Sequence, residues 1–162
     1  EADLVEVVVA EQTIGETTDR AEAFVESLDR TPVVVRDAPG VVSTRLALAL
    51  EAEAMRLVEE GVAGVAAIDE AFTAGFDNPM GPLERADRAG LDRRLATFEY
   101  LGVELGERFL PPPILEDRVA AGRTGLASGE GFYVWENGEP TEPAVPAPTL
   151  TREATGLDDS TQ

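Results

Sequence analysis

The sequence predicts a mainly helical domain that is preceded by one strand–helix–strand unit. In residues 1–37, two short runs rich in β-branched residues flank one amphipathic helical segment. From residue 38 onward apolar residues recur at helical spacing, and glycine or proline interrupts the pattern where helices would end. A chain of 162 residues is long enough for about one domain with a core of its own.

The strand–helix–strand unit is expected to be the edge of a larger α/β sheet. The stretch LVEVVVA, Leu4 to Ala10, predicts a buried strand, and TPVVVR at residues 31–36 predicts a second one. The helix between them has Thr17 or Thr18 as its expected N-cap. Two strands do not form a stable sheet alone, so further strands are expected beside them.

The first long helix is expected within residues 41–61, with Gly61 as its stop. Glu53 lies seven residues after Leu46, inside the apolar stripe that the helical spacing predicts. A buried carboxylate needs a partner, so an ion pair with an arginine is favoured over a role in a site. The expected stripe consists of Leu46, Leu50, Ala54, Leu57 and Val58.

The stretch GFDNPMGPLERADRAGLD, residues 75–92, predicts a corner between two helices. Asn78-Pro79 ends one helix, and Pro82 occupies the first position of the next. This helix and the one after it are amphipathic, another helix begins at Pro113, and GRTGLASGEGFYVW is expected to end in an aromatic strand or anchor. Because residues 136–162 are polar and rich in proline, we expect a disordered acidic tail there.

The composition excludes several classes of function. The chain has no histidine and no cysteine, so a Ser-His pair, a thiolate nucleophile and the usual zinc sites are excluded. With 32 acidic against 13 basic residues, all of them arginine, the net charge is −19. Nucleic acid and anionic membranes are therefore not expected partners. Acidic residues spread along a lysine-free chain favour a halophilic protein over a docking surface for a cation.

No glycine pattern indicates a nucleotide site. GVAGVA, residues 61–66, lacks the G-x-G-x-x-G spacing and follows a helix. GRTGLASGEG has no lysine and no following helix, so its glycines are interpreted as turn residues. The carboxylates do not have the spacing of a calcium loop, and no metal site is predicted. The residues by themselves therefore predict architecture and no chemistry.

Several motifs together resemble a known family. VVVRDAPGVVSTRL, IDEAFTAGFDNPMGPLERADRAGLD and PPPILEDRVAAGRTGLASGEGFY are similar, in order and spacing, to the carboxy-terminal half of L-3-hydroxyacyl-CoA dehydrogenases. The resemblance covers about Leu4 to Trp135. It implies that residues 1–37 are the remnant of a Rossmann-type NAD-binding domain. It also implies that residues 38–135 form a helical domain that closes over acyl-CoA and forms a homodimer.

The resemblance also assigns positions to the site of this family. The asparagine that precedes the arginine of its first long helix corresponds to Thr44, with Ser43 as the neighbouring alternative. The lysine that reaches toward the cofactor corresponds to Ala127, and Glu53 matches a glutamate of the first helix. The histidine base and its glutamate partner are expected upstream.

These assignments give two expectations about function. The first is the substrate-side part of a cytoplasmic, NAD-dependent dehydrogenase of fatty-acid β-oxidation, inactive without its other half. The second is a non-catalytic dimerisation or assembly module that is derived from the family. The substitutions at Thr44 and Ala127 favour this second reading.

Overall fold

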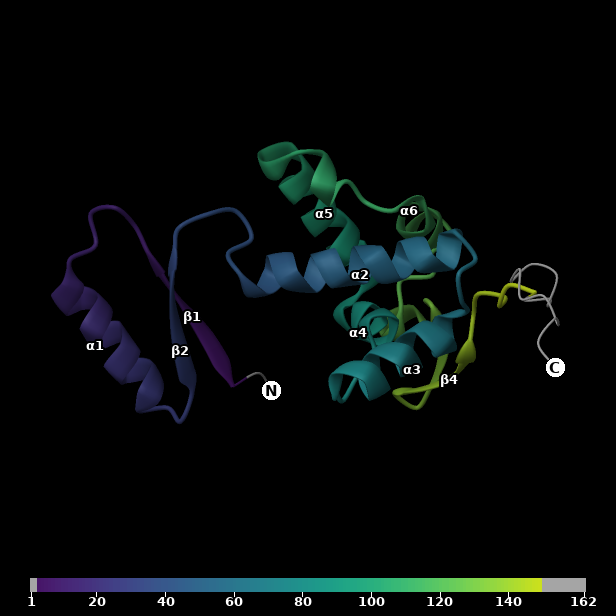
Figure 1. Ribbon diagram of the computed structural model, residues 1–162, viewed down its shortest axis with the longest axis horizontal. Helices are drawn as coiled ribbons and strands as arrows, with labels where there is room; N and C mark the ends of the chain where they lie inside the picture. The colour runs from purple at the N-terminus through teal and green to yellow at the C-terminus, as the bar shows by residue number, and fades with distance from the viewer. Residues whose placement is uncertain (1–2, 150–162) are drawn as a thin grey trace, which may run out of the picture. The chain divides into compact units, whose positions relative to one another are not determined.

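The computed structural model describes residues 3–149, which belong to two compact units (Figure 1). Unit 1 contains residues up to 49 together with 98–110, and unit 2 contains 50–97 and the residues from 111 onward. The fold is mainly helical, as predicted, and it has two small two-stranded sheets among the described residues.

Unit 1 contains the expected strand–helix–strand arrangement. Strands β1 (Leu4–Val9) and β2 (Thr31–Arg36) are parallel, and α1 (Gly15–Glu26) connects them as a crossover helix (Figure 1). The N-cap prediction was wrong, because α1 begins before Thr17 and Ile14 occupies the cap position without a side-chain hydrogen bond. Several apolar side chains of both strands are exposed, which is what the edge of a larger sheet would leave uncovered.

The remaining elements follow the order that the sequence predicts. Pro82 and Pro113 each lie in the first turn of their helices, and Leu83 and Leu91 of the predicted corner are fully buried. The elements are α2 (Ser43–Glu59), α3 (Val65–Phe76), α4 (Pro82–Ala89), α5 (Leu91–Leu105), α6 (Pro113–Ala120), the 3-10 helices Glu107–Phe109 and Leu126–Ser128, and the strands β3 (Tyr133–Glu136) and β4 (Glu139–Pro143).

The chain does not become irregular at Glu136, so this part of the tail prediction was wrong. Asn137 and Gly138 have positive φ angles of 54° and 85° and connect β3 to the antiparallel β4. Asn-Gly is a strong signal for a tight hairpin turn, and it outweighs the polar composition around it. Residues 150–162 of the expected tail lie outside the described residues.

Two buried aspartates connect distant segments of unit 2. Asp69 on α3 accepts hydrogen bonds from the backbone N–H groups of Leu83 (2.8 Å) and Glu84 (2.9 Å) and from the Tyr133 hydroxyl (2.9 Å). The two amides belong to the first turn of α4, whose N-cap position is Gly81 and offers no side chain. Asp69 therefore supplies the cap that α4 lacks.

Asp87 on α4 accepts from three donors of the glycine-rich return segment. These are the backbone N–H groups of Phe132 and Tyr133 and the indole N–H of Trp135, each at 2.9 Å. A Cβ on Gly125 would overlap the backbone of Asp87, and one on Gly131 would overlap its carboxylate. These two glycines are therefore required by the close approach to Asp87.

The buried face of α2 differs from the predicted one. Glu53 is 64% exposed and pairs weakly with Arg56 at 3.8 Å, and Leu46 is 67% exposed. The buried residues recur at helical spacing, but they lie on another face of the helix than the predicted one. The prediction failed because α2 carries apolar side chains on two faces, and its alanines fit either face. The buried residues of α2 are Leu48, Glu51, Ala52, Ala54 and Met55, of which Ala54 belongs to the predicted stripe.

The buried carboxylate of α2 is therefore Glu51, which is fully buried. Arg94 on α5 donates a hydrogen bond to Glu51 Oε1 at 2.9 Å. Among the described residues, Glu51 Oε2 and Arg94 Nε have no hydrogen-bond partner. Burial raises the pKa of Glu51 from 4.5 to about 7, although the positive charge of Arg94 acts in the opposite direction.

Glu51→Gln is expected to reduce the dependence of stability on pH. Because the folded chain holds the Glu51 proton up to about pH 7 and the unfolded chain releases it near 4.5, this group favours folding most below pH 4.5. This contribution to the free energy of unfolding is lost as the pH rises through about 7. The loss is up to about 3 kcal/mol, because one pKa unit corresponds to about 1.36 kcal/mol. When the pH rises from about 5 to about 8, the free energy of unfolding should fall more for the unmodified chain than for Glu51→Gln.

Urea unfolding in molar KCl, followed by the fluorescence of Trp135, measures this difference. The control is Glu53→Gln, which makes the same charge change at an exposed position of the same helix. Equal pH dependence of the unmodified chain and Glu51→Gln would contradict the assignment.

Candidate functional site

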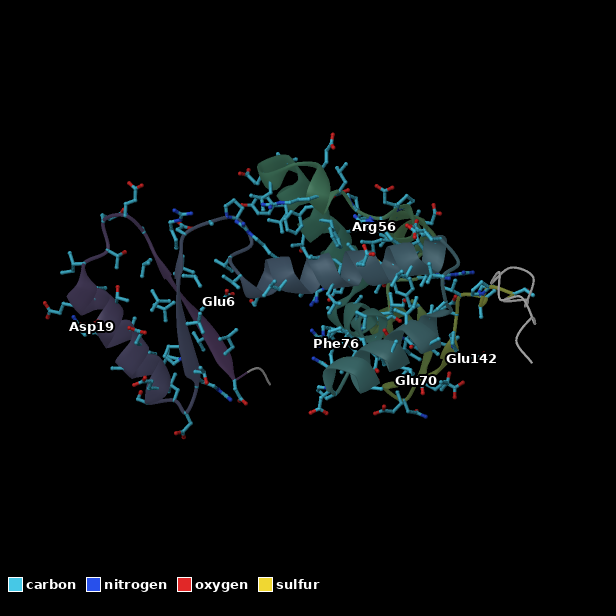
Figure 2. The ribbon with its side chains drawn as sticks, viewed as in Figure 1. Glu6, Asp19, Arg56, Glu70, Phe76 and Glu142 are labelled. Carbon is cyan, nitrogen blue, oxygen red and sulfur yellow. The ribbon has the colours of Figure 1, made fainter. Side chains whose placement is uncertain are left out.

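The first turn of α2 is bound by a carboxylate from β1. Glu6 Oε1 accepts hydrogen bonds from the backbone N–H groups of Val42 (2.8 Å) and Ser43 (3.1 Å), and Glu6 Oε2 accepts from the Ser43 hydroxyl at 2.6 Å. All three residues lie in unit 1. Figure 2 labels Glu6 on its strand. A carboxylate at a helix N-terminus also interacts favourably with the helix dipole.

These contacts favour the ionised form of the Glu6 carboxyl. The hydrogen bond from the Ser43 hydroxyl is the main cause that lowers the pKa of Glu6. Partial burial raises the pKa, and the amides of Ser43 and Val42 lower it further. Sequence reasoning did not single out Glu6. The available signal was a single carboxylate within an otherwise apolar strand, LVEVVV.

The two predicted site residues on α2 have different surroundings. The Ser43 hydroxyl is directed to Glu6. Thr44 is half-buried, and its hydroxyl makes no hydrogen bond to any described residue. Arg45 donates from Nε to the carbonyl oxygen of Pro39 at 2.7 Å, which fixes the turn before the helix. Of the pair, Ser43 is therefore the residue whose hydroxyl is used within the described part of the chain.

Ala127, the position that the resemblance compares with a lysine, lies in unit 2 in the 3-10 helix Leu126–Ser128. It lines a polar pocket of about 330 Å³ together with Thr124 and the arginines Arg88 and Arg93. Its methyl group provides no donor there.

Unit 2 also contains an apolar groove of about 440 Å³ between α2 and α3. The rings of Phe72 and Phe76 stack with centroids 5.2 Å apart, and Phe76 is 75% exposed. Figure 2 labels Phe76. Among the residues that line this groove, Glu53 is the charged one. The groove is lined by Leu50, Glu53, Ala54, Leu57, Val62, Ala63, Ala67, Ile68, Ala71, Phe72, Phe76 and Pro82.

The turn from β1 to α1 lacks the features of a dinucleotide-binding turn. The turn from β1 to α1, residues 10–14, contains no glycine, and the helix cap at Ile14 offers no side-chain hydrogen bond. This turn does not fit a pyrophosphate, which binds at a glycine-rich strand-to-helix turn. Within residues 3–149 there is no acidic group of three that could hold a metal ion, and no helix is long and apolar enough to cross a membrane.

Comparison with known proteins gives one consistent result. The model of the family "3-hydroxyacyl-CoA dehydrogenase, C-terminal domain" matches residues 40–135. A probable 3-hydroxybutyryl-CoA dehydrogenase of Deinococcus radiodurans is 44% identical over 131 residues, covering 80% of this chain and 47% of the relative. A protein with the same name from Bacillus subtilis is 44% identical over 134 residues, covering 82% and 47%.

A solved structure shows the same fold. The (S)-3-hydroxybutyryl-CoA dehydrogenase PaaH1 from Ralstonia eutropha is 35% identical, with a TM-score of 0.79 over 84% of this chain and 48% of that chain. This chain therefore spans about half the length of the relatives that it matches. The matched region runs from before α2 into β3, and it thus includes Ser43, Thr44 and Ala127. The chain belongs to the 3-hydroxyacyl-CoA dehydrogenase family and contains its C-terminal domain.

Proposed function

We propose that this chain is the substrate-side part of an NAD-dependent L-3-hydroxyacyl-CoA dehydrogenase. The intact enzyme would oxidise 3-hydroxyacyl-CoA to 3-oxoacyl-CoA in fatty-acid β-oxidation. The observation that carries the proposal is the start of α2, where the Glu6 carboxylate accepts a hydrogen bond from the Ser43 hydroxyl. Thr44 follows directly, and its hydroxyl makes no hydrogen bond to a described residue. The names of the relatives support the reaction class.

The other half of the enzyme would supply the seat for NAD and the histidine base, because the turn from β1 to α1 lacks the features of such a seat and residues 3–149 contain no histidine. NAD would accept the hydride from C3 of the substrate. We propose that Glu6, in place of a glutamate further upstream, orients this base. A carboxylate has about four acceptor positions. Three of those of Glu6 are used by Val42 and Ser43, so one remains for an imidazole N–H.

Thr44 would contact the substrate. Its hydroxyl can donate one hydrogen bond to a thioester carbonyl oxygen, although it lacks the reach of an amide. Binding the carbonyl would hold the reacting carbon near the base. The alternative is a non-catalytic assembly module, which the alanine at position 127 favours because it leaves no donor toward a cofactor.

A fused protein tests this proposal. The amino-terminal half of the Bacillus subtilis relative, joined to this chain, should bind NADH and reduce acetoacetyl-CoA, whereas the chain alone should do neither. In the fusion, Glu6→Gln should lower kcat by about 100-fold, because the base loses its orienting charge. NADH fluorescence titration and the loss of NADH absorbance measure the two activities.

The control is Glu70→Gln, which makes the same charge change at an exposed position of α3 (Figure 2). A folded fusion that binds NADH without any turnover would support the assembly module instead. NADH binding by the chain alone would contradict the division between the two halves.

We also propose that the helical part forms a homodimer and that the groove around Phe76 is its interface. Phe76→Asp should then shift the chain toward monomer by light scattering in molar KCl, because a buried interface aromatic contributes about 2 kcal/mol or more. Val103→Asp, at an exposed apolar position of α5, is the matched control. Dissociation by the control and not by Phe76→Asp would place the interface elsewhere.

A further inference from the structure

Ser43 makes a side-chain contact to which the proposed function assigns no role of its own. Its hydroxyl donates to Glu6 Oε2 at 2.6 Å, across 37 positions of the sequence. The same residue donates its backbone N–H to Glu6 Oε1. One residue therefore engages both oxygens of the carboxylate.

The three donors to Glu6 are not equivalent. The amides of Val42 and Ser43 would be present with any side chain at either position. The hydroxyl is the donor that depends on the identity of residue 43, and it is the partner of Oε2. Without it, Glu6 would be bound through one oxygen, and Oε2 would face solvent at this partly exposed position.

This contact also determines how α2 begins. Val42 precedes the helix and has no polar side chain that could cap it. Glu6 accepts the first amides instead, so the first turn of α2 is fastened to β1. Thr44 follows Ser43 directly, and the orientation of its hydroxyl depends on that turn.

We propose that Ser43 is a positioning residue, which holds the Glu6 carboxylate in one orientation and thereby fixes the first turn of α2, with Thr44, to β1. The consequence for catalysis rests on the proposed function, but the contact itself does not. The described groups that affect the pKa of Glu6 are Ser43 and Val42, together with partial burial. A change at residue 43 should therefore be visible in the titration of Glu6.

The experiment is a pH titration of the Glu6 side-chain carboxyl by ¹³C NMR in the unmodified chain, Ser43→Ala and Ser43→Thr. Ser43→Ala should shift the titration to higher pH, because the main cause of the low pKa is removed. Ser43→Thr keeps a hydroxyl and should restore it. The amide signals of Val42 and Ser43 should follow the same titration and should lose it in Glu6→Gln.

The matched control is Ser27→Ala, since Ser27 is in the same unit and its hydroxyl donates to the carbonyl oxygen of Phe24. It should leave the Glu6 titration unchanged. A Ser43→Ala chain in which Glu6 titrates as in the unmodified chain would overturn the proposal. Because this readout needs neither NADH nor substrate, its failure is distinguishable from an inactive fusion.

Discussion

The carboxylate of Asp87 determines how unit 2 packs. It binds two backbone amides and one indole N–H from a segment about 45 positions later in the chain. These donors are buried, and a buried donor without a partner costs on the order of 1–3 kcal/mol. The contact also requires glycine at positions 125 and 131, since a side chain there would overlap Asp87. The spacing between the two segments is therefore tied to the geometry of one interaction.

The same principle recurs at three helix starts. Glu6 binds the first amides of α2, Asp69 those of α4, and Glu59 accepts from the N–H of Ile114 in α6 at 2.8 Å. The N-cap positions of α4 and α6 are Gly81 and Pro112, whose side chains offer no hydrogen-bond acceptor for the helix amides. In a chain with a net charge of −19, carboxylates from other elements satisfy these amides. The fold thus uses acidic residues as internal connections, and at α2 the connection also reaches the candidate site.

Features determined by local sequence could be predicted, and those determined by tertiary contact could not. Pro82 and Pro113 fix helix starts through their backbone geometry, and both predictions were confirmed. The predicted buried face of α2 was wrong, because the helix has two apolar faces and the elements that pack on it determine which face is buried. The buried carboxylate is therefore Glu51 and not Glu53. Glu6 was missed because its role depends on residues 42 and 43, far away in sequence. The hairpin after Glu136 had a local sequence signal, Asn137-Gly138. The prediction missed it because it relied on the polar, proline-rich composition of residues 136–162.

The most direct test of the role of Asp87 is the free energy of unfolding of Asp87→Ala. Trp135 is the single tryptophan of the chain and donates to Asp87, so its fluorescence reports on unit 2. The control is Asp117→Ala, which changes an exposed aspartate on α6. Relative to this control, we expect Asp87→Ala to lower the free energy of unfolding by about 3–5 kcal/mol, or to abolish the cooperative unfolding transition. A stability within about 0.5 kcal/mol of that control would contradict it.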